Sequence, residues 1–378
     1  MRRLAILLLP WLPGVFAAPR TSTTYLVYIG THALGTGSPG IFAYRFAPAS
    51  GEVRSIGLVK QMANPFFLAV DPGRKYLYAG TIIDGRTPDS VTSFAIDRSN
   101  GALRLLNSVS SRGTSACYLV ADHTGKMLMV ADYADGKVAA FSLHRDGRIG
   151  ETGGLVQHHG SSVDPERQSS SHPHAVVLSP DNRFAFVPDL GLDQIRIYRI
   201  DPVNARLTEN DPPFAKVNPG SGPRHMAFAP DGKFAYLVNE LQSTVTVFAY
   251  DAARGSLAAQ QTVSTLPPGY EGKNTAAEIE IDEAGLFVYA SNRGHDSIVV
   301  FSIDQTTGMI TPVAYVPSGG REPWSFKIDP TGGYLLAANK ETHNVVIFRL
   351  DPKTGLPKPT GKSIDVPSPV CIQFVPAL

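Results

Sequence analysis

The sequence contains little cysteine and little charge. Only Cys117 and Cys371 occur among 378 residues, and a domain of this size does not need disulfides to build its core. Both lie in apolar strand patterns, which favours two buried free thiols and leaves a bridge between them open. Charged residues make up 18% of the chain, with 34 Lys and Arg against 33 Asp and Glu. Without a basic excess to neutralise phosphates, nucleic acid is not an expected partner.

Long hydrophobic runs are also scarce. Two arginines precede an apolar core at Leu4–Leu9, and Val15 and Ala17 fit the small residues before a cleavage site. We interpret residues 1–17 as a secretory signal peptide, which predicts a secreted or periplasmic protein; the alternative is a disordered or buried N-terminal tail. The run is too short and too interrupted by proline to span a bilayer, which takes about 20 apolar residues. No other run approaches that length, so no membrane association is expected.

Glycine (35 residues) and proline (30) are abundant, and they punctuate a repeated phrase. The phrase is an apolar strand, a turn opened by Asp, Ser or Ala, a second apolar strand ending in polar residues, and a third strand that alternates. Its clearest turns begin at Asp71, Asp122, Ser179, Ala229, Asp282 and Asp329. Four strands in about 50 residues is the period of a β-propeller blade, so the sequence predicts an all-β propeller.

A seventh copy is split between the two ends of the chain. Residues 25–30 (YLVYIG) match the second strand of the other copies, and residues 369–374 (PVCIQF) match the first strand at 323–328 (PWSFKI). The C-terminal strand should therefore complete the first blade and close the ring, which removes an open sheet edge. We predict that residues 18–378 form one seven-bladed β-propeller with four antiparallel strands per blade. The stretch from about 151 to 171 is expected to be a long irregular loop, either a lid or a disordered insertion.

Propeller geometry gathers distant residues at one mouth of the channel. The first two strands of a blade are antiparallel, so the start of the first and the end of the second lie at the same rim. The residues at first-strand starts are Phe66, Cys117, His174, Arg224, His225, Glu278, Trp324 and Val370. The residues at second-strand ends are His32, Ile82, Tyr133, Leu190, Glu240, Arg293 and Lys340. Acids, bases and cations around one mouth favour a small polar ligand, and arginines suit a carboxylate or phosphate.

Several motifs at these positions resemble those of the lactonase propeller family, which includes bacterial 6-phosphogluconolactonase of the seven-bladed type and the fungal carboxymuconate cyclase. They are SSVDPERQ (161–168), SHPH (171–174), VPDLGLD (187–193), GPRH (222–225), NEL (239–241), AEI (277–279) and SNRGHDS (291–297). The resemblance covers about residues 24–375. It implies a hydrolase without metal or cofactor that opens an anionic sugar-type lactone. It places the catalytic residues at His174, Arg224, Glu240 and Arg293.

One position departs from the family pattern. Family members often carry arginine after the proline at 323, whereas this chain has Trp324. If that arginine holds a phosphate, the substrate here differs, and the expected export points the same way because a sugar-phosphate lactone is a cytosolic metabolite.

The predicted reaction is attack of water on a lactone carbonyl. His174, alone or with Glu240, would take a proton from the water, and Arg224 or Arg293 would stabilise the oxyanion. His225 or Glu278 would protonate the departing ring oxygen. The remaining predicted substrate-binding residues are His32, His172, Lys340 and Arg167.

Three alternatives stay open at this point. The same groups suit the reverse reaction, closure of a muconate-type carboxylate onto an alkene. Propellers also host non-catalytic binding proteins, because fold alone does not imply chemistry. His172 and His174, with His158 and His159 nearby, could bind zinc, but the intervening proline and the lack of a cysteine pair favour loop histidines. We expect no metal and a monomer.

Overall fold

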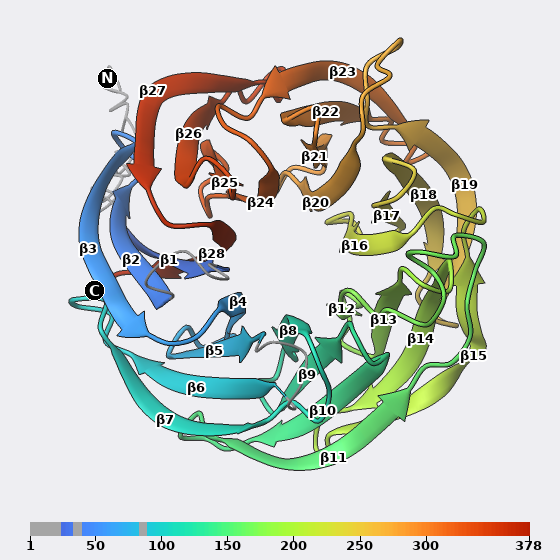
Figure 1. Ribbon diagram of the computed structural model, residues 1–378, viewed down its shortest axis with the longest axis horizontal. Coiled ribbons are helices and arrows are strands. Elements are labelled where there is room, and N and C mark those ends of the chain that lie inside the picture. Colours follow the sequence, from blue (N-terminus) through green and yellow to red (C-terminus); the bar gives the residue numbers. More distant parts are fainter. Residues whose placement is uncertain (1–23, 33–39, 83–88) are drawn as a thin grey trace, which may run out of the picture.

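The computed structural model describes residues 24–32, 40–82 and 89–378, so the signal-peptide prediction for residues 1–17 lies outside the described part. Twenty-eight strands form seven four-stranded antiparallel sheets, and the described residues contain no helix. The sheets stand around a common axis like the blades of a propeller (Figure 1). The predicted all-β, seven-bladed fold is confirmed. No helix within the described ranges is long and apolar enough to cross a membrane.

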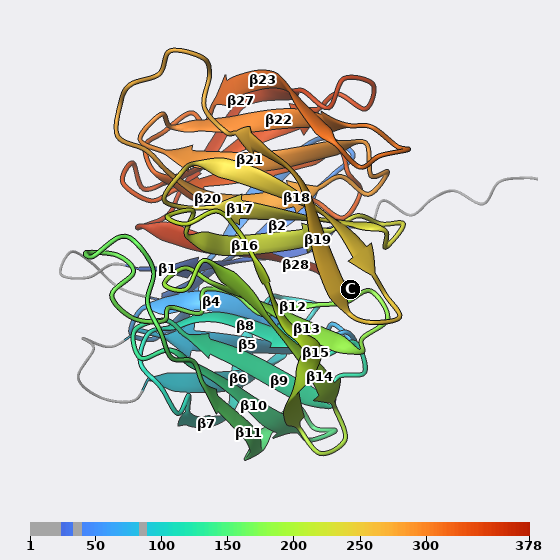
Figure 2. The ribbon, with the colours of Figure 1, turned by 90° about the vertical axis from the view of Figure 1, so that its right-hand side faces the viewer.

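The innermost strands line the axis and run along it (Figure 2). They are β28 (Pro369–Pro376), β4 (Pro65–Val70), β8 (Ala116–Ala121), β12 (Val177–Leu178), β16 (Pro223–Phe228), β20 (Thr275–Ile281) and β24 (Pro323–Ile328). The second strands are β1 (Tyr25–Thr31), β5 (Tyr76–Thr81), β9 (Met127–Asp132), β13 (Phe184–Asp189), β17 (Phe234–Asn239), β21 (Phe287–Arg293) and β25 (Tyr334–Asn339).

Two further layers complete each blade. The third strands are β2 (Gly40–Ala47), β6 (Ser90–Ile96), β10 (Lys137–Leu143), β14 (Gln194–Asp201), β18 (Thr244–Asp251), β22 (Ser297–Ile303) and β26 (Asn344–Leu350). The outermost strands are β3 (Glu52–Gln61), β7 (Leu103–Ser110), β11 (Ile149–Gln157), β15 (Arg206–Lys216), β19 (Ser256–Ser264), β23 (Ile310–Pro317) and β27 (Pro357–Asp365).

The ring closes where the sequence predicts. β28 pairs with β1, with Tyr25 opposite Pro376 and Gly30 opposite Cys371, so the first blade has the order β28-β1-β2-β3. Figure 1 shows this C-terminal strand beside the N-terminal blade. Pairing the two ends of the chain leaves no unpaired inner strand and ties the first and last blades together.

The repeated turn has a physical basis in its first and fourth residues. Oδ1 of Asp122 accepts the backbone N–H groups of Lys126 and Met127, both at 2.7 Å, and thereby fixes the turn between first and second strands. The fourth residue, Gly125, has a φ of +67°, a left-handed conformation that glycine adopts without strain. The same Asp contact recurs at Asp71 and Asp282, which explains why the phrase repeats.

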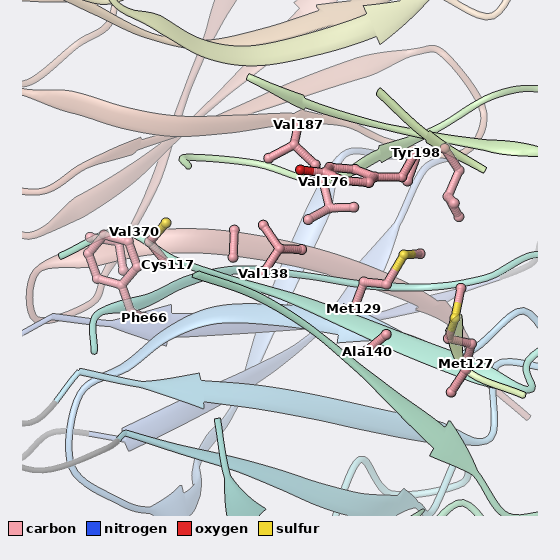
Figure 3. Packing of buried hydrophobic residues seen from close by; sticks show 14 residues of the cluster. Phe66, Cys117, Met127, Met129, Val138, Ala140, Val176, Val187, Tyr198 and Val370 are labelled. Carbon is pink, nitrogen blue, oxygen red and sulfur yellow. The ribbon is translucent and has the colours of Figure 1, made fainter. Parts of the chain in front are cut away.

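The cores lie between neighbouring blades. In one cluster Val176, Val187 and Tyr198 of the fourth blade pack toward Met129 and Val138 of the third (Figure 3). The aromatic side chains at equivalent strand positions are all 0–1% exposed, namely Phe186, Tyr236, Phe248, Phe301 and Phe348. Packing between blades therefore explains these residues. Cys117 and Cys371 are buried free thiols, as favoured from the sequence.

The prediction that an irregular loop begins at about residue 151 is wrong. β11 continues to Gln157, and the irregular segment starts at His158. β11 contains two glycines, Gly153 and Gly154, which allow a close approach of the next blade. A Cβ on Gly153 would collide with the backbone oxygens of Asn204 and Ala205.

Candidate active site

A bulge near the start of the inner strands decides which side chains reach the mouth. Pro223 pairs with Asn239 but His225 pairs with Val238, so Arg224 is an extra residue in β16. The other inner strands except β12 carry an extra residue at the same place. Arg224 and Trp324 occupy this position in β16 and β24, at the mouth. The next residue of each strand, such as His225, lines the axial channel below.

Glu240, directly after β17, is the centre of the mouth. Its Oε2 accepts a hydrogen bond from Nε of Arg224 at 3.0 Å and forms an ion pair with Nη2 of Arg293 at 2.9 Å. Its Oε1 accepts Nη2 of Arg167 at 2.7 Å. His174 completes the group, with Nε2 at 3.9 Å from Oε2. We call these five residues the mouth cluster; they come from four separate parts of the chain.

The mouth cluster carries excess positive charge. Burial alone raises the pKa of Glu240, but Arg293 and Arg224, followed by His174 and Arg167, outweigh it and hold that pKa well below its ordinary value. Glu240 is therefore ionised at neutral pH. Burial, with the neighbouring Arg293, lowers the pKa of Arg224 to about 10, so Arg224 stays charged. Three guanidinium groups against one carboxylate leave two positive charges for an anion.

His174 is held neutral beside these charges. Burial, then Arg224 and His225, lowers the pKa of His174 well below 6.5. Its Nδ1 faces Sγ of Cys117 at 3.9 Å, and Nε2 faces Glu240. Burial also raises the pKa of Cys117, so this neighbour is a protonated thiol. A neutral imidazole whose Nε2 points into a cationic pocket can accept a proton from a bound water.

His225 and Glu278 lie one layer deeper than expected from the sequence. Nδ1 of His225 is 2.8 Å from Oε1 of Glu278, and Nε2 is 3.3 Å from Nη1 of Arg224. Arg224 can only donate hydrogen bonds, so Nε2 of His225 is the acceptor. Nδ1 of His225 therefore carries the hydrogen and donates a hydrogen bond to Glu278. The pair thus supports Arg224 from below, and His225 has no free proton for a leaving group.

The indole ring of Trp324 lies against two cationic side chains at the mouth. Nζ of Lys340 lies 4.3 Å from the centroid of its ring, and the guanidinium of Arg293 lies 4.5 Å from it. Lys340 is also paired with Glu322 at 3.3 Å. Phe66 packs edge-to-face on Trp324, with ring centroids 5.8 Å apart. The tryptophan therefore forms, with Phe66, an apolar wall beside the cationic pocket.

His32 lies at the end of this wall. Its ring packs against Phe66 with centroids 5.0 Å apart, and burial, then Lys340, lowers its pKa to about 4. His32 is thus uncharged at neutral pH and belongs to the margin of the site.

The irregular segment 158–172, which we call the strap, brings Arg167 over the mouth. Arg167 reaches both Glu240 and, at 3.4 Å, the hydroxyl of Tyr133. His172 packs on Tyr133: its ring stacks on the tyrosine ring, with centroids 4.5 Å apart, and Nδ1 lies 2.9 Å from the Tyr133 carbonyl oxygen. These contacts anchor the strap, and a role of His172 in substrate binding stays a prediction.

The zinc alternative is not supported. His158 is buried between Asp189 (2.7 Å) and the hydroxyl of Tyr198 (2.8 Å), and His159 is exposed. Across the described ranges no three His, Cys, Asp or Glu side chains are placed to hold a metal ion.

Two hollows flank the mouth cluster. A groove of about 550 Å³ beside Arg293 is lined also by Lys273, Thr275, Arg321 and Glu322. A larger cavity of about 670 Å³ follows the axis below the mouth and is lined by the inner strands, with His225 and Glu278 at its upper end. The larger cavity is lined by none of the mouth cluster, whereas the groove is lined by Arg293, one of its members.

The sequence places Tyr133 on the rim without a role. Its position at a second-strand end is the only signal that the sequence offers. Its hydroxyl contacts Arg167 and its ring meets His174 edge-to-face at 5.2 Å, so it joins the strap to the mouth cluster.

Comparison with known proteins agrees with this geometry. The family description "Lactonase, 7-bladed beta-propeller" matches residues 26–374. The chain belongs to this lactonase family. Two curated relatives are named 6-phosphogluconolactonase: one from Bacillus subtilis, 33% identical over 80% of this chain and 85% of the relative, and one from Formosa agariphila, 33% identical over 79% and 85%.

A solved structure extends the family likeness to the whole propeller. The periplasmic gluconolactonase of Pseudomonas aeruginosa superposes with a TM-score of 0.88 at 33% identity, covering 94% of this chain and 100% of that one. Family membership makes this chain a lactonase-type propeller, as the motifs at the mouth suggested.

Proposed function

We propose that the protein hydrolyses a sugar-type lactone at the mouth cluster, with His174 as general base and Arg224 and Arg293 as the oxyanion site. The observation that carries this proposal is the neutral imidazole of His174 facing an ionised Glu240 that is shared by three arginines. Membership of the lactonase family supports the reaction class.

The arginines can hold the reacting carbonyl. Arg224 uses Nε on Glu240 and Nη1 on the Ala277 carbonyl oxygen, and Arg293 uses Nη2 on Glu240. Nε and Nη2 of Arg293 also donate to the carbonyl oxygens of Thr275 and Ala276. Among the described residues, the hydrogen bonds of the two arginines therefore come from their other nitrogens and not from Nη2 of Arg224 or Nη1 of Arg293. These two nitrogens are free to bind the carbonyl oxygen, on which negative charge develops as water attacks.

The proton follows a closed path in this scheme. Water oxygen bonds to the carbonyl carbon while His174 Nε2 takes one proton. The tetrahedral intermediate then breaks its bond to the ring oxygen, which receives that proton from His174. Glu240 is a poor base because its pKa is low, so it does not take the proton itself. Its negative charge instead stabilises the transient imidazolium of His174. The product is a hydroxy acid, which gives the second proton of the attacking water to solvent, and its carboxylate stays opposite the arginines until release.

A lactone without phosphate suits the site best. Lys340, the cation nearest to the Trp324 ring, is already paired with Glu322, and the indole stands where a family arginine often stands. The excess positive charge lies near the reacting carbonyl instead. The periplasmic gluconolactonase neighbour supports the same choice and supports export of this protein to the periplasm.

A turnover screen of purified protein tests the proposal. Glucono-1,5-lactone, its 6-phosphate and carboxymuconate are each offered, with and without chelator, and uncatalysed hydrolysis is subtracted. We expect chelator-insensitive opening of the sugar lactones, faster for the unphosphorylated one. Turnover of muconate alone would indicate the lactonising cyclase, and no turnover of any substrate would indicate a binding protein.

A further inference from the structure

The two ends of the strap meet on a single buried carboxylate. Asp189, the last residue of β13, is 0% exposed. Its Oδ2 lies 2.7 Å from Nδ1 of His158, at the start of the strap, and its Oδ1 accepts the backbone N–H of His172, at the end, at 2.7 Å. A second bond on His158, from Nε2 to the hydroxyl of Tyr198, fixes the imidazole on its other side.

Two side-chain hydrogen bonds hold the middle of the strap against the residues that follow β13. Ser162 donates its hydroxyl to Oδ2 of Asp193 at 2.6 Å, and Gln168 donates Nε2 to the carbonyl oxygen of Leu190 at 2.8 Å. Arg167 is the neighbour of Gln168, so these bonds aim its side chain across the mouth toward Glu240.

An acid is needed at Asp189 for this purpose. The equivalent strand ends in the fifth and seventh blades carry Asn239 and Asn339, whose side-chain oxygens have no hydrogen-bond partner in the described chain. An asparagine offers one acceptor oxygen, whereas a carboxylate offers two and can hold both ends of the strap at once.

We propose that Asp189 is a positioning residue that acts through Arg167: by closing the strap it keeps the third guanidinium on Glu240. The inference rests on the proposed function. The side chain of Arg167 is 40% exposed, so without the closure it would lose its fixed geometry to rotamer freedom. The pocket would then lose one of its cations. Because the proposed lactone is uncharged and negative charge develops only as water attacks, the chemical step would weaken more than substrate binding.

A double-mutant cycle tests whether Asp189 acts through Arg167. We expect Asp189→Asn and Arg167→Ala each to lower kcat/KM about tenfold, mainly through kcat, as expected for one charge that acts on the developing oxyanion. The double variant should be no worse than Arg167→Ala alone, because the two residues serve one contact. Multiplied losses, or an unchanged kcat/KM in Asp189→Asn, would overturn the proposal.

A second measurement does not depend on activity. Amide hydrogen exchange of residues 159–171 should be faster in Asp189→Asn than in wild type. If Asp189→Asn does not fold, His158→Gln replaces it and should show the same increase. Asp132→Asn is the matched control, since Asp132 ends β9 and is equally buried, and it should leave strap exchange unchanged. Unchanged strap exchange in Asp189→Asn, or in His158→Gln if that variant has to be used, would refute the closure. Faster exchange in an inactive protein would locate the failure in the proposed function.

Discussion

Nε2 of His174 lies 3.9 Å from Oε2 of Glu240, too far for a direct hydrogen bond and close enough for one water molecule to bridge the two atoms. The two groups are fixed in complementary states, since the pKa of each is lowered: the imidazole is neutral and the carboxylate is charged. Burial first, and then Arg224, keeps His174 from protonating, and Arg224 together with Arg293 also keeps Glu240 ionised.

This pairing predicts the acid limb of activity. His174 must be neutral to accept a proton, and its pKa lies well below 6.5, so kcat/KM should be flat between about pH 6 and 8. The fall should begin only at more acidic pH. A pH-stat assay with spontaneous hydrolysis subtracted measures the profile, and an inflection at or above 6.5 would contradict a lowered His174 pKa.

Removing the charge of Glu240 should damage both activity and stability. Glu240→Gln leaves buried arginines without their anion, which should cost about 3 to 5 kcal/mol of unfolding free energy and reduce kcat/KM by about 10² to 10³. Because the folded pKa of Glu240 is depressed, its stabilisation is present above its unfolded pKa and is lost as pH falls through the folded value.

Denaturant unfolding at several pH values checks this. The gap between wild type and Glu240→Gln should be widest above about pH 5 and should narrow in acid. A gap that does not change with pH would mean that the carboxylate charge is not what holds the arginines.

Trp324 should control the response to phosphate. Trp324→Arg adds a cation at the mouth and removes the apolar wall, so the ratio of kcat/KM for the 6-phosphate over the unphosphorylated lactone should rise about tenfold. Trp324→Phe, which keeps an aromatic ring, is the control and should move the ratio little. An unchanged ratio in the arginine variant would show that this position does not contact the substrate.

Asp132 should destabilise the fold at neutral pH. Burial raises its pKa to about 8 against a weaker, opposing contact with Ser111, and neither carboxylate oxygen has a hydrogen bond of good geometry within the described ranges. The folded pKa exceeds the unfolded value of about 3.9, so this group weakens the fold progressively between about pH 4 and 8. Asp132→Asn should therefore be more stable than wild type by about 1 to 3 kcal/mol at pH 8.

Thermal or denaturant unfolding across pH 4 to 9 tests the Asp132 prediction. The advantage of Asp132→Asn should grow up to about pH 8 and then level off. Asp189→Asn should have the opposite sign, because Asp189 is bonded to His158 and His172. Loss of stability in Asp132→Asn at pH 8 would refute the prediction.

The fold was predictable because its local signals repeat. An Asp that pins a turn, as Asp122 does, leaves the same trace in several blades, and the strand at residues 369–374 matches the one at 323–328. The start of the strap was not predictable, because Gly153 and Gly154 have the composition of a loop. Glycine is needed there because the backbone of the neighbouring blade lies too close for a side chain, and no local sequence pattern reveals that contact.

The convergence of the mouth cluster was predictable from topology. The depth at which neighbouring residues such as Arg224 and His225 lie along the channel was not. Antiparallel pairing was enough to bring Arg224, Glu240 and Arg293 to one rim. The extra residue at Arg224 separates it from His225 by a whole layer, and a bulge of this kind leaves no mark in the sequence. The anchoring of the strap by Asp189 is likewise a contact between distant residues that composition does not signal.

The central claim is that His174 opens the lactone, and steady-state kinetics of His174→Gln test it most directly. Glutamine keeps much of the side-chain volume but cannot take up a proton. With an unchanged circular dichroism spectrum and melting temperature, kcat/KM for glucono-1,5-lactone should fall by about 10² to 10⁴, the usual contribution of a general base. A folded His174→Gln protein with wild-type kcat/KM would contradict the account.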